Sequence, residues 1–144
     1  MNRGYYGVAI YNGKNEINYG TLLRTSHLLG ASFFCVIGKR FKRQASDTMK
    51  SHRHVPTFEY SSFDDFYKNL PFECQLVGVE LSKEAKELKD FVHPQRAVYL
   101  LGAEDHGLSP EIVRKCHHVV QLKGERSMNM AVAGSIVLYH REAL

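Results

Sequence analysis

The sequence has 144 residues, 44% of them hydrophobic, which is enough apolar material for one domain, residues 1–144, with its own core. The formal net charge of +4 is compatible with a polyanionic partner, but many proteins without such a partner are equally basic. The three cysteines lie far apart in apolar runs, so neither a disulfide framework nor a cysteine zinc site is predicted. The sequence has neither the roughly 20-residue apolar stretch of a membrane-spanning helix nor a signal peptide's apolar core. We therefore expect a cytoplasmic protein with reduced thiols and no membrane contact.

Short runs rich in β-branched and aromatic residues alternate with helical stretches along the chain. Strands are predicted at 5–11, 32–37, 55–60, 75–79, 96–101 and 118–122. Helices are predicted at 21–29, 61–70, 82–90, 109–116 and 129–142, with serine N-caps for the second and fourth of them. This alternation predicts an α/β fold in which a mostly parallel sheet has helices on both faces.

In open α/β sheets, ligands bind beyond the carboxyl ends of the strands. Three segments near such ends carry unusual residues. The first is 18–25, in which Asn18 and Gly20 suit a tight turn into the following helix. Arg24 then falls in the first or second turn of that helix. The alternative interpretation is a turn followed by an exposed, structural arginine.

The second segment is 101–108, directly after the clearest strand. Gly102 and Gly107 allow the backbone to approach a ligand closely or to adopt a positive φ angle. Glu104 lies just beyond a buried strand, which is a costly place for a carboxylate without a partner. The glycine-rich motifs of nucleoside triphosphate sites are absent. Three adjacent residues, 104–106, form a poor metal pattern, so no metal site is predicted.

The third segment is 124–133, which leaves a buried strand and enters an apolar helix. Ser127 and Asn129 are natural N-caps, so a purely structural role is the alternative interpretation. The helix that follows shows little amphipathicity, and a helix that is apolar all round is buried all round. In a protein of this size, we expect one face of this helix to pack on the sheet and another on a second subunit.

Together these segments resemble the SpoU (TrmH-like) family of RNA ribose methyltransferases, which belongs to the knotted SPOUT superfamily. The family pattern Asn-x-Gly-x-x-x-Arg-Thr is matched by 18–25, and Leu-Gly-x-Glu-x-x-Gly-Leu is matched by 101–108. The pattern Ser-Leu-Asn-Val-x-Val-Ala is matched by 127–133, with methionine at the second and fourth positions. The three motifs occur in the family's order, and the resemblance covers essentially the whole chain.

The resemblance implies a deep trefoil knot in the C-terminal half, which composition could not show. It also implies that the knotted loops hold S-adenosylmethionine in a bent shape, mainly through backbone groups. The residues expected by position to contact this cofactor are Val79, Gly102, Leu122, Ser127 and Met130. Family members work as homodimers that pack their first and last helices together, which agrees with the interpretation of the final helix.

The resemblance further implies a catalytic group of Arg24, Asn18, Glu104, Ser127 and Asn129 around the target ribose. The reaction is in-line displacement of a methyl group by the ribose 2′-oxygen, and it requires proximity, orientation and removal of a proton. An arginine has been cast as the base in this family, but its side chain stays protonated in proteins. We therefore favour a role in which Arg24 orients the hydroxyl and a neighbouring phosphate while another group accepts the proton.

One position departs from the family pattern. The segment before the third motif usually reads Ile-Pro-Met, whereas here Gln121 stands in place of the proline. We expect this change to loosen the cofactor loop, although binding through backbone groups is compatible with it.

A basic stretch follows the second predicted strand, on the same rim of the sheet as the first motif. Its cationic side chains would neutralise phosphates, and Phe41 is suited to stack on a base. The residues expected to bind RNA are Arg24, Lys39, Arg40, Lys42 and Arg43. The alternative is a solvated loop with Phe41 folded inward.

Three functions remain open at this point. The leading one is 2′-O-ribose methylation of tRNA or rRNA, with tRNA favoured because no RNA-binding extension is seen. The second is a non-catalytic RNA-binding or assembly protein that retains the fold; the intact Asn18, Arg24, Glu104 and Asn129 argue against it. The third is methylation of a base, against which the Asn-x-Gly-x-x-x-Arg motif argues.

Overall fold

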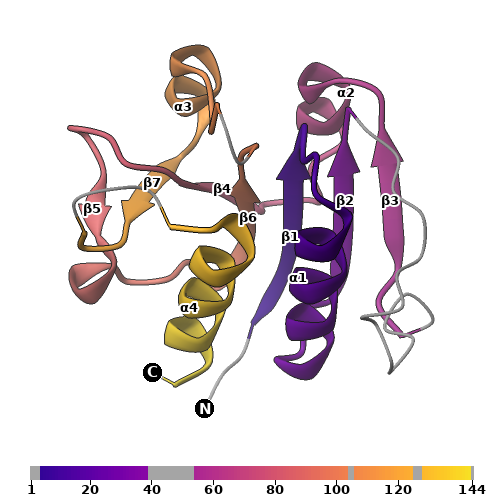
Figure 1. Cartoon of the computed structure of the whole chain (residues 1–144), viewed down its shortest axis with the longest axis horizontal. Coiled ribbons are helices and arrows are strands. Elements are labelled where there is room, and N and C mark those ends of the chain that lie inside the picture. Colours follow the sequence, from indigo (N-terminus) through magenta and orange to yellow (C-terminus); the bar gives the residue numbers. More distant parts are fainter. Residues whose placement is uncertain (1–3, 39–53, 104–105, 125–127, 144) are drawn as a thin grey trace.

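A computed structural model of the protein describes residues 4–38, 54–103, 106–124 and 128–143. The described residues form a seven-stranded sheet in the order β3-β2-β1-β6-β4-β7-β5, and its strand pairs are all parallel (Figure 1). The strands are β1 (Tyr5–Tyr11), β2 (Phe33–Ile37), β3 (Thr57–Tyr60), β4 (Gln75–Val79), β5 (Lys86–Glu87), β6 (Arg96–Leu101) and β7 (His118–Gln121). The helices are α1 (Glu16–Leu28), α2 (Phe63–Lys68), α3 (Pro110–Lys115) and α4 (Met130–Ala143). The predicted α/β fold with a parallel sheet is thus confirmed.

Helices cover both faces of the sheet, as the alternation of elements predicts. Helices α1 and α4 lie side by side over one face (Figure 1), where the hydroxyl of Ser135 donates to that of Thr25 at 3.2 Å. Their apolar side chains, such as Val137, join one core cluster with residues of the strands. Helices α2 and α3 contribute Phe66 and Ile112 to a second cluster. Burial on both faces explains why the strands are continuous apolar runs.

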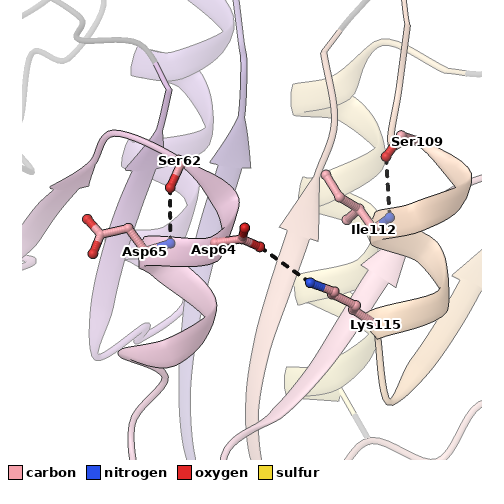
Figure 2. Close-up of polar contacts among 6 residues, drawn as sticks. All are labelled: Ser62, Asp64, Asp65, Ser109, Ile112 and Lys115. Atoms are coloured by element: carbon pink, nitrogen blue, oxygen red, sulfur yellow. Dashed lines mark hydrogen bonds and ion pairs between the residues drawn. The ribbon is translucent and has the colours of Figure 1, made fainter.

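The two short helices α2 and α3 both start at the serine N-caps that the sequence predicts. The hydroxyl of Ser62 accepts a hydrogen bond from the N–H of Asp65 at 3.1 Å, and Ser109 caps α3 in the same way (Figure 2). Between the helices, Lys115 forms an ion pair with Asp64 at 3.3 Å. Because Asp64 is largely exposed, this pair contributes little to stability, and the apolar contacts beneath hold the helices on the sheet.

One predicted helix is wrong. The segment 82–90 forms the two-residue strand β5 and a 3-10 helix at Leu88–Asp90. Its charged sequence has no strong helical apolar period, whereas pairing of β5 with β7 and burial of Leu88 stabilise the extended path. Tertiary contacts therefore decide the structure of this segment.

Helix α1 begins earlier than predicted. The side chain of Asn15 is its N-cap and accepts from the N–H groups of Ile17 at 2.8 Å and Asn18 at 3.1 Å. Glu16 adds an acidic residue to the first turn, which the helix dipole favours. Asn18 and Gly20, which we predicted in a turn before the helix, therefore lie inside it, and both are buried.

The three cysteines are free thiols, which agrees with the expected absence of a disulfide framework. Burial raises the pKa of Cys35 to about 12 and that of Cys116 to about 12, so both thiols stay protonated and unreactive at neutral pH. Among the described residues, no helix has the length and apolar character needed to cross a membrane.

Candidate active site

A cavity of about 210 Å³ opens at the carboxyl ends of β4, β6 and β7, beside the start of α4. These three strands are neighbours in the sheet, with β4 in the middle. Such a position is where parallel α/β sheets bind ligands. Four residues predicted to contact a cofactor line this cavity: Val79, Gly102, Leu122 and Met130. The fifth, Ser127, lies outside the described residues.

The two glycines of the second motif allow a tight crossing of the backbone at this cavity. A Cβ at Gly102 would lie 2.4 Å from the carbonyl carbon of Gly107 and 2.7 Å from the nitrogen of Leu108. The N–H of Gly107 donates to the carbonyl of Ala103 at 2.8 Å, and φ at Gly107 is 61°. Both glycines are therefore needed for the backbone path, as the sequence predicts. Glu104, between them, lies outside the described residues.

Glu80 also lines this cavity, although it was not among the predicted site residues. It directly follows β4, and its Oε1 accepts a hydrogen bond from the N–H of Leu108 at 3.1 Å. Burial raises the pKa of Glu80 above its usual value. The signal that could have found Glu80 is the one applied to Glu104, namely a carboxylate placed immediately after a buried strand.

Asn18 and Asn129 come together although they are 111 positions apart. The Nδ2 of Asn129 donates to the Oδ1 of Asn18 at 3.1 Å. The Oδ1 of Asn129 caps α4 by accepting from the N–H groups of Ala131 at 2.9 Å and Val132 at 3.1 Å. The side chain of Asn129 is thus fixed at both ends of its amide, and it joins the first motif to the third.

Arg24 is half-buried in the third turn of α1, one turn later than predicted because the helix starts earlier. Its neighbour Thr25 contacts Ser135 of α4, so the first motif contacts the α4 segment at a second point. The other predicted catalytic and RNA-binding residues lie outside the described part of the chain: Glu104, Ser127, Lys39, Arg40, Lys42 and Arg43.

Gln121, which stands where the family pattern has proline, is the last residue of β7 and lines the cavity. Its side-chain amide donates to the carbonyl of Ala85 at 3.4 Å. This contact ties the end of β7 to the segment that enters β5. A proline at this position could not make it.

The paired histidines at the start of β7 have structural partners. His117 accepts a hydrogen bond from the N–H of Leu76 through Nδ1 at 2.8 Å, and His118 is hydrogen-bonded to Gln75. Within residues 4–38, 54–103, 106–124 and 128–143, no group of three histidine, cysteine or acidic side chains could hold a metal ion.

The protein has the features of an α/β protein that binds a small ligand at its strand ends. These features are the parallel sheet, the cavity at the ends of three adjacent strands, and the asparagine pair at the junction of α1 and α4. A sequence profile narrows this class to one family, because the SpoU rRNA Methylase family profile matches residues 6–139. The chain belongs to this family.

Several relatives and solved structures are similar to the chain. The tRNA (guanosine(18)-2′-O)-methyltransferase of Aquifex aeolicus is 31% identical over 140 residues, which are 91% of this chain and 65% of that protein. The AdoMet-bound rRNA methyltransferase of Sinorhizobium meliloti has a TM-score of 0.87 at 23% identity, covering 98% of this chain and 57% of that one. The TrmH/SpoU tRNA modifying enzyme of A. aeolicus has a TM-score of 0.81 at 25% identity, covering 99% of this chain and 75% of that one. The chain thus spans just under two thirds of the Aquifex methyltransferase.

Proposed function

We propose that this protein transfers a methyl group from S-adenosylmethionine to a ribose 2′-hydroxyl of RNA. The observation that carries the proposal is the meeting of the family motifs at one place. The second motif and the start of α4 line the cavity, and Asn129 of the third motif contacts Asn18 of the first. The printed name of the Aquifex relative, a tRNA guanosine 2′-O-methyltransferase, supports the same reaction.

The cavity fits the proposed cofactor. Val79, Leu122 and Met130 give it apolar walls that suit an adenine ring, and Glu80 and Gln121 add polar partners that suit a ribose or an amino acid. Gly102 lines the cavity without a side chain, because the place of its Cβ is taken by the backbone of Gly107. When bound, S-adenosylmethionine supplies a methyl group activated by a sulfonium centre.

The residues at the junction of α1 and α4 would position the target ribose. The amide of Asn129 is held by its cap and by Asn18, so its orientation is set before any RNA arrives. Its Nδ2 carries a second hydrogen that is suited to a ribose oxygen. Arg24 would orient the 2′-hydroxyl and a neighbouring phosphate, because a guanidinium that stays protonated is a good anion partner and a poor base. Another group then accepts the proton.

The RNA partner we favour is a tRNA. The name of the Aquifex relative supports this choice, and the basic stretch at Lys39, Arg40, Lys42 and Arg43 would contact phosphates. A cytoplasmic location is part of the proposal, and the three free thiols agree with a reducing compartment.

A homodimer formed through α1 and α4 is also part of the proposal. In the single chain, α4 is not buried all round: Val132, Ile136 and Tyr139 are 50%, 39% and 65% exposed. Their spacing places these three side chains on one face of the helix. A second copy of the chain would bury this face beside Arg24 and the asparagine pair. Sedimentation of wild type and a Val132→Glu variant tests this, since a monomeric wild type would contradict it.

The trefoil knot belongs to the proposal as well. The path of the chain after β6 supports it, because the chain passes through α3 to β7, on the far side of β4, and then returns as α4 to pack beside α1.

The test of function uses methyl-labelled S-adenosylmethionine, purified protein, and bulk tRNA and rRNA from cells that lack the protein. Label should enter RNA as a 2′-O-methylnucleoside, which resists alkaline hydrolysis at that linkage, and should be lost with Arg24→Ala. Arg114→Ala, which removes an exposed arginine of α3, is the matched control and should transfer normally.

The outcomes separate the functions considered. Label in an alkali-labile nucleoside would indicate a base methyltransferase. Cofactor binding without transfer to any RNA would favour the non-catalytic function. A protein that binds no cofactor would overturn the enzymatic proposal.

A further inference from the structure

Glu80 occupies a central position among the strand ends. It follows β4, the middle strand of the three that end at the cofactor cavity. It also lines a second cavity of about 710 Å³, whose walls come from segments 80–91 and 108–119. Glu80 and Leu81 are the residues common to both cavities, so the carboxylate stands in the wall between them.

Among the residues that the structure describes, the carboxylate of Glu80 has one hydrogen-bond partner. Its Oε1 accepts from the N–H of Leu108, and a Cβ on Gly107 would come within 2.6 Å of this oxygen. Within the part of the chain that the structure describes, Glu80 forms no ion pair. Burial raises its pKa, so the charged form loses solvation that the hydrogen bond from Leu108, within the described part of the chain, does not fully replace. A ligand that donates hydrogen bonds to Oε2 would supply the missing partners.

We propose that Glu80 binds the ribose of S-adenosylmethionine by accepting hydrogen bonds from its 2′- and 3′-hydroxyls. The inference rests on the proposed function, which supplies the cofactor. The ribose is the middle part of that molecule, between adenine and the sulfonium, and Glu80 follows the middle strand of the cavity. Two vicinal hydroxyls match the two lone pairs of Oε2, which accepts no hydrogen bond from the described residues.

The direction of the Glu80 side chain separates it from the reaction centre. Its carboxylate lies against Gly107 and Leu108, and Leu108 belongs to the core cluster of α2 and α3. The asparagine pair lies with α1 and α4 on the other face. Glu80 would therefore hold the cofactor from the side of the sheet opposite to the asparagine pair. Its role is in binding and positioning.

The experiment measures dissociation constants by calorimetry for wild type and Glu80→Gln. The probes are S-adenosylhomocysteine, its 2′-deoxyribose derivative and methylthioadenosine, which lacks the amino acid. Glu80→Gln keeps the shape of the side chain and an oxygen for the N–H of Leu108. The matched control is Glu84→Gln, which alters an exposed carboxylate that lines only the second cavity.

Glu80→Gln should raise the dissociation constant of S-adenosylhomocysteine about tenfold, which is the scale of a hydrogen bond to a charged group. The same loss should appear with methylthioadenosine and should be clearly smaller with the deoxyribose derivative, which keeps only the 3′-hydroxyl. Wild type alone should also bind the deoxyribose derivative about tenfold more weakly, which checks the contact without any variant. Glu84→Gln should bind all three probes as wild type does.

Three results would overturn the inference. A loss that persists with the deoxyribose derivative and vanishes with methylthioadenosine would mean that Glu80 holds the amino acid instead. Equal affinities of wild type and Glu80→Gln for S-adenosylhomocysteine would mean that it holds neither, while the proposed function would stand. If wild type itself binds no probe, the proposed function fails, and the inference fails with it.

Discussion

The two ends of α4 use their polar side chains in opposite ways. At its start, Asn129 is exposed and lies between two methionines that line the cofactor cavity. At its end, Arg141 is buried, and its guanidinium donates to the carbonyls of Pro94 at 2.7 Å and Gln95 at 3.0 Å. It also donates to the hydroxyl of Tyr99 at 2.9 Å. The guanidinium of Arg141 thus forms its hydrogen bonds inside the protein.

The network at the end of α4 continues through two histidines. The hydroxyl of Tyr99 lies 2.7 Å from Nδ1 of His93, whose Nε2 lies 2.7 Å from Nδ1 of His140. A neutral His93 can accept from the Tyr99 hydroxyl through Nδ1 while the Tyr99 oxygen accepts from Arg141. Burial, followed by the nearby His140 and Arg141, lowers the pKa of His93 to about 4.

The two ends of α4 differ in whether their polar side chains stabilise the fold or can contact a ligand. Polar groups at the end of α4 hydrogen-bond to one another and to the carbonyls before β6, and these bonds hold the helix on the sheet, so they serve stability. At the start of α4, the exposed side chain of Asn129 is held in place by Asn18 and by its cap. After β4, the carboxylate of Glu80 accepts from the N–H of Leu108, so both line up at the cavity end of the strands with room for a ligand. Substitutions at the two ends should therefore separate stability from function.

The largest effect on stability should come from Arg141→Met. The variant removes a buried guanidinium and leaves two carbonyls and the Tyr99 hydroxyl without their donor. We expect a loss of about 3–5 kcal/mol in the free energy of unfolding, as for other broken buried charge networks. Urea denaturation measures it, and Arg141→Lys should lose less because one donor group remains. A loss below about 1 kcal/mol would show that the network does not hold α4.

The next largest effect on stability should come from Gly102→Ala, at the carboxyl end of β6. The added methyl would meet the backbone of Gly107, which cannot move as a side-chain tip can. We expect a loss of about 1–3 kcal/mol in the free energy of unfolding, typical of overpacking, together with loss of S-adenosylhomocysteine binding. Gly124→Ala, at an exposed position, is the control. Unchanged binding by a folded Gly102→Ala protein would contradict the proposed cavity.

The pH dependence of stability should report on the His93 network. Since the pKa of His93 falls from 6.5 in the unfolded chain to about 4 in the folded protein, its contribution is fully present above pH 6.5. It is lost as the pH falls from 6.5 toward 4, by about 1–2 kcal/mol once partial solvent exposure is discounted. His93→Gln should remove this part of the pH dependence, and His54→Gln should not. Parallel stability curves for wild type and His93→Gln would contradict the assignment.

The strands and helix caps could be predicted because their signals are local. The apolar run at β2 and the serine caps of α2 and α3 need no distant partner to be recognised. The start of α1 was missed because both Asn15 and Asn18 are good caps, and only the folded chain shows which of them is used. β5 was missed because its pairing partner, β7, comes more than thirty residues later.

The site residues also divide into those that local sequence signals predict and those that depend on distant contacts. Gly102 and Gly107 are recognisable from the needs of a close backbone crossing, so their roles follow from the sequence. The contact between Asn18 and Asn129 joins residues 111 positions apart, and only the family resemblance anticipated it. Glu80 follows a buried strand as Glu104 does and could have been predicted on that ground, but its contact with the N–H of Leu108 joins residues 28 positions apart and could not.

The smallest effect on stability, and the sharpest on function, should come from Asn129→Ser. Serine caps a helix about as well as asparagine, so the free energy of unfolding should stay within about 0.5 kcal/mol of wild type. Its shorter side chain cannot reach Asn18, so methyl transfer to RNA should fall by at least about tenfold, as expected when a positioning contact is lost. Asn129→Ala should show the same loss of transfer and, in addition, a loss of about 1 kcal/mol in stability because the cap is gone. If Asn129→Ser transfers at the wild-type rate, Asn129 is only a cap, and the start of α4 would then resemble its end in serving stability alone.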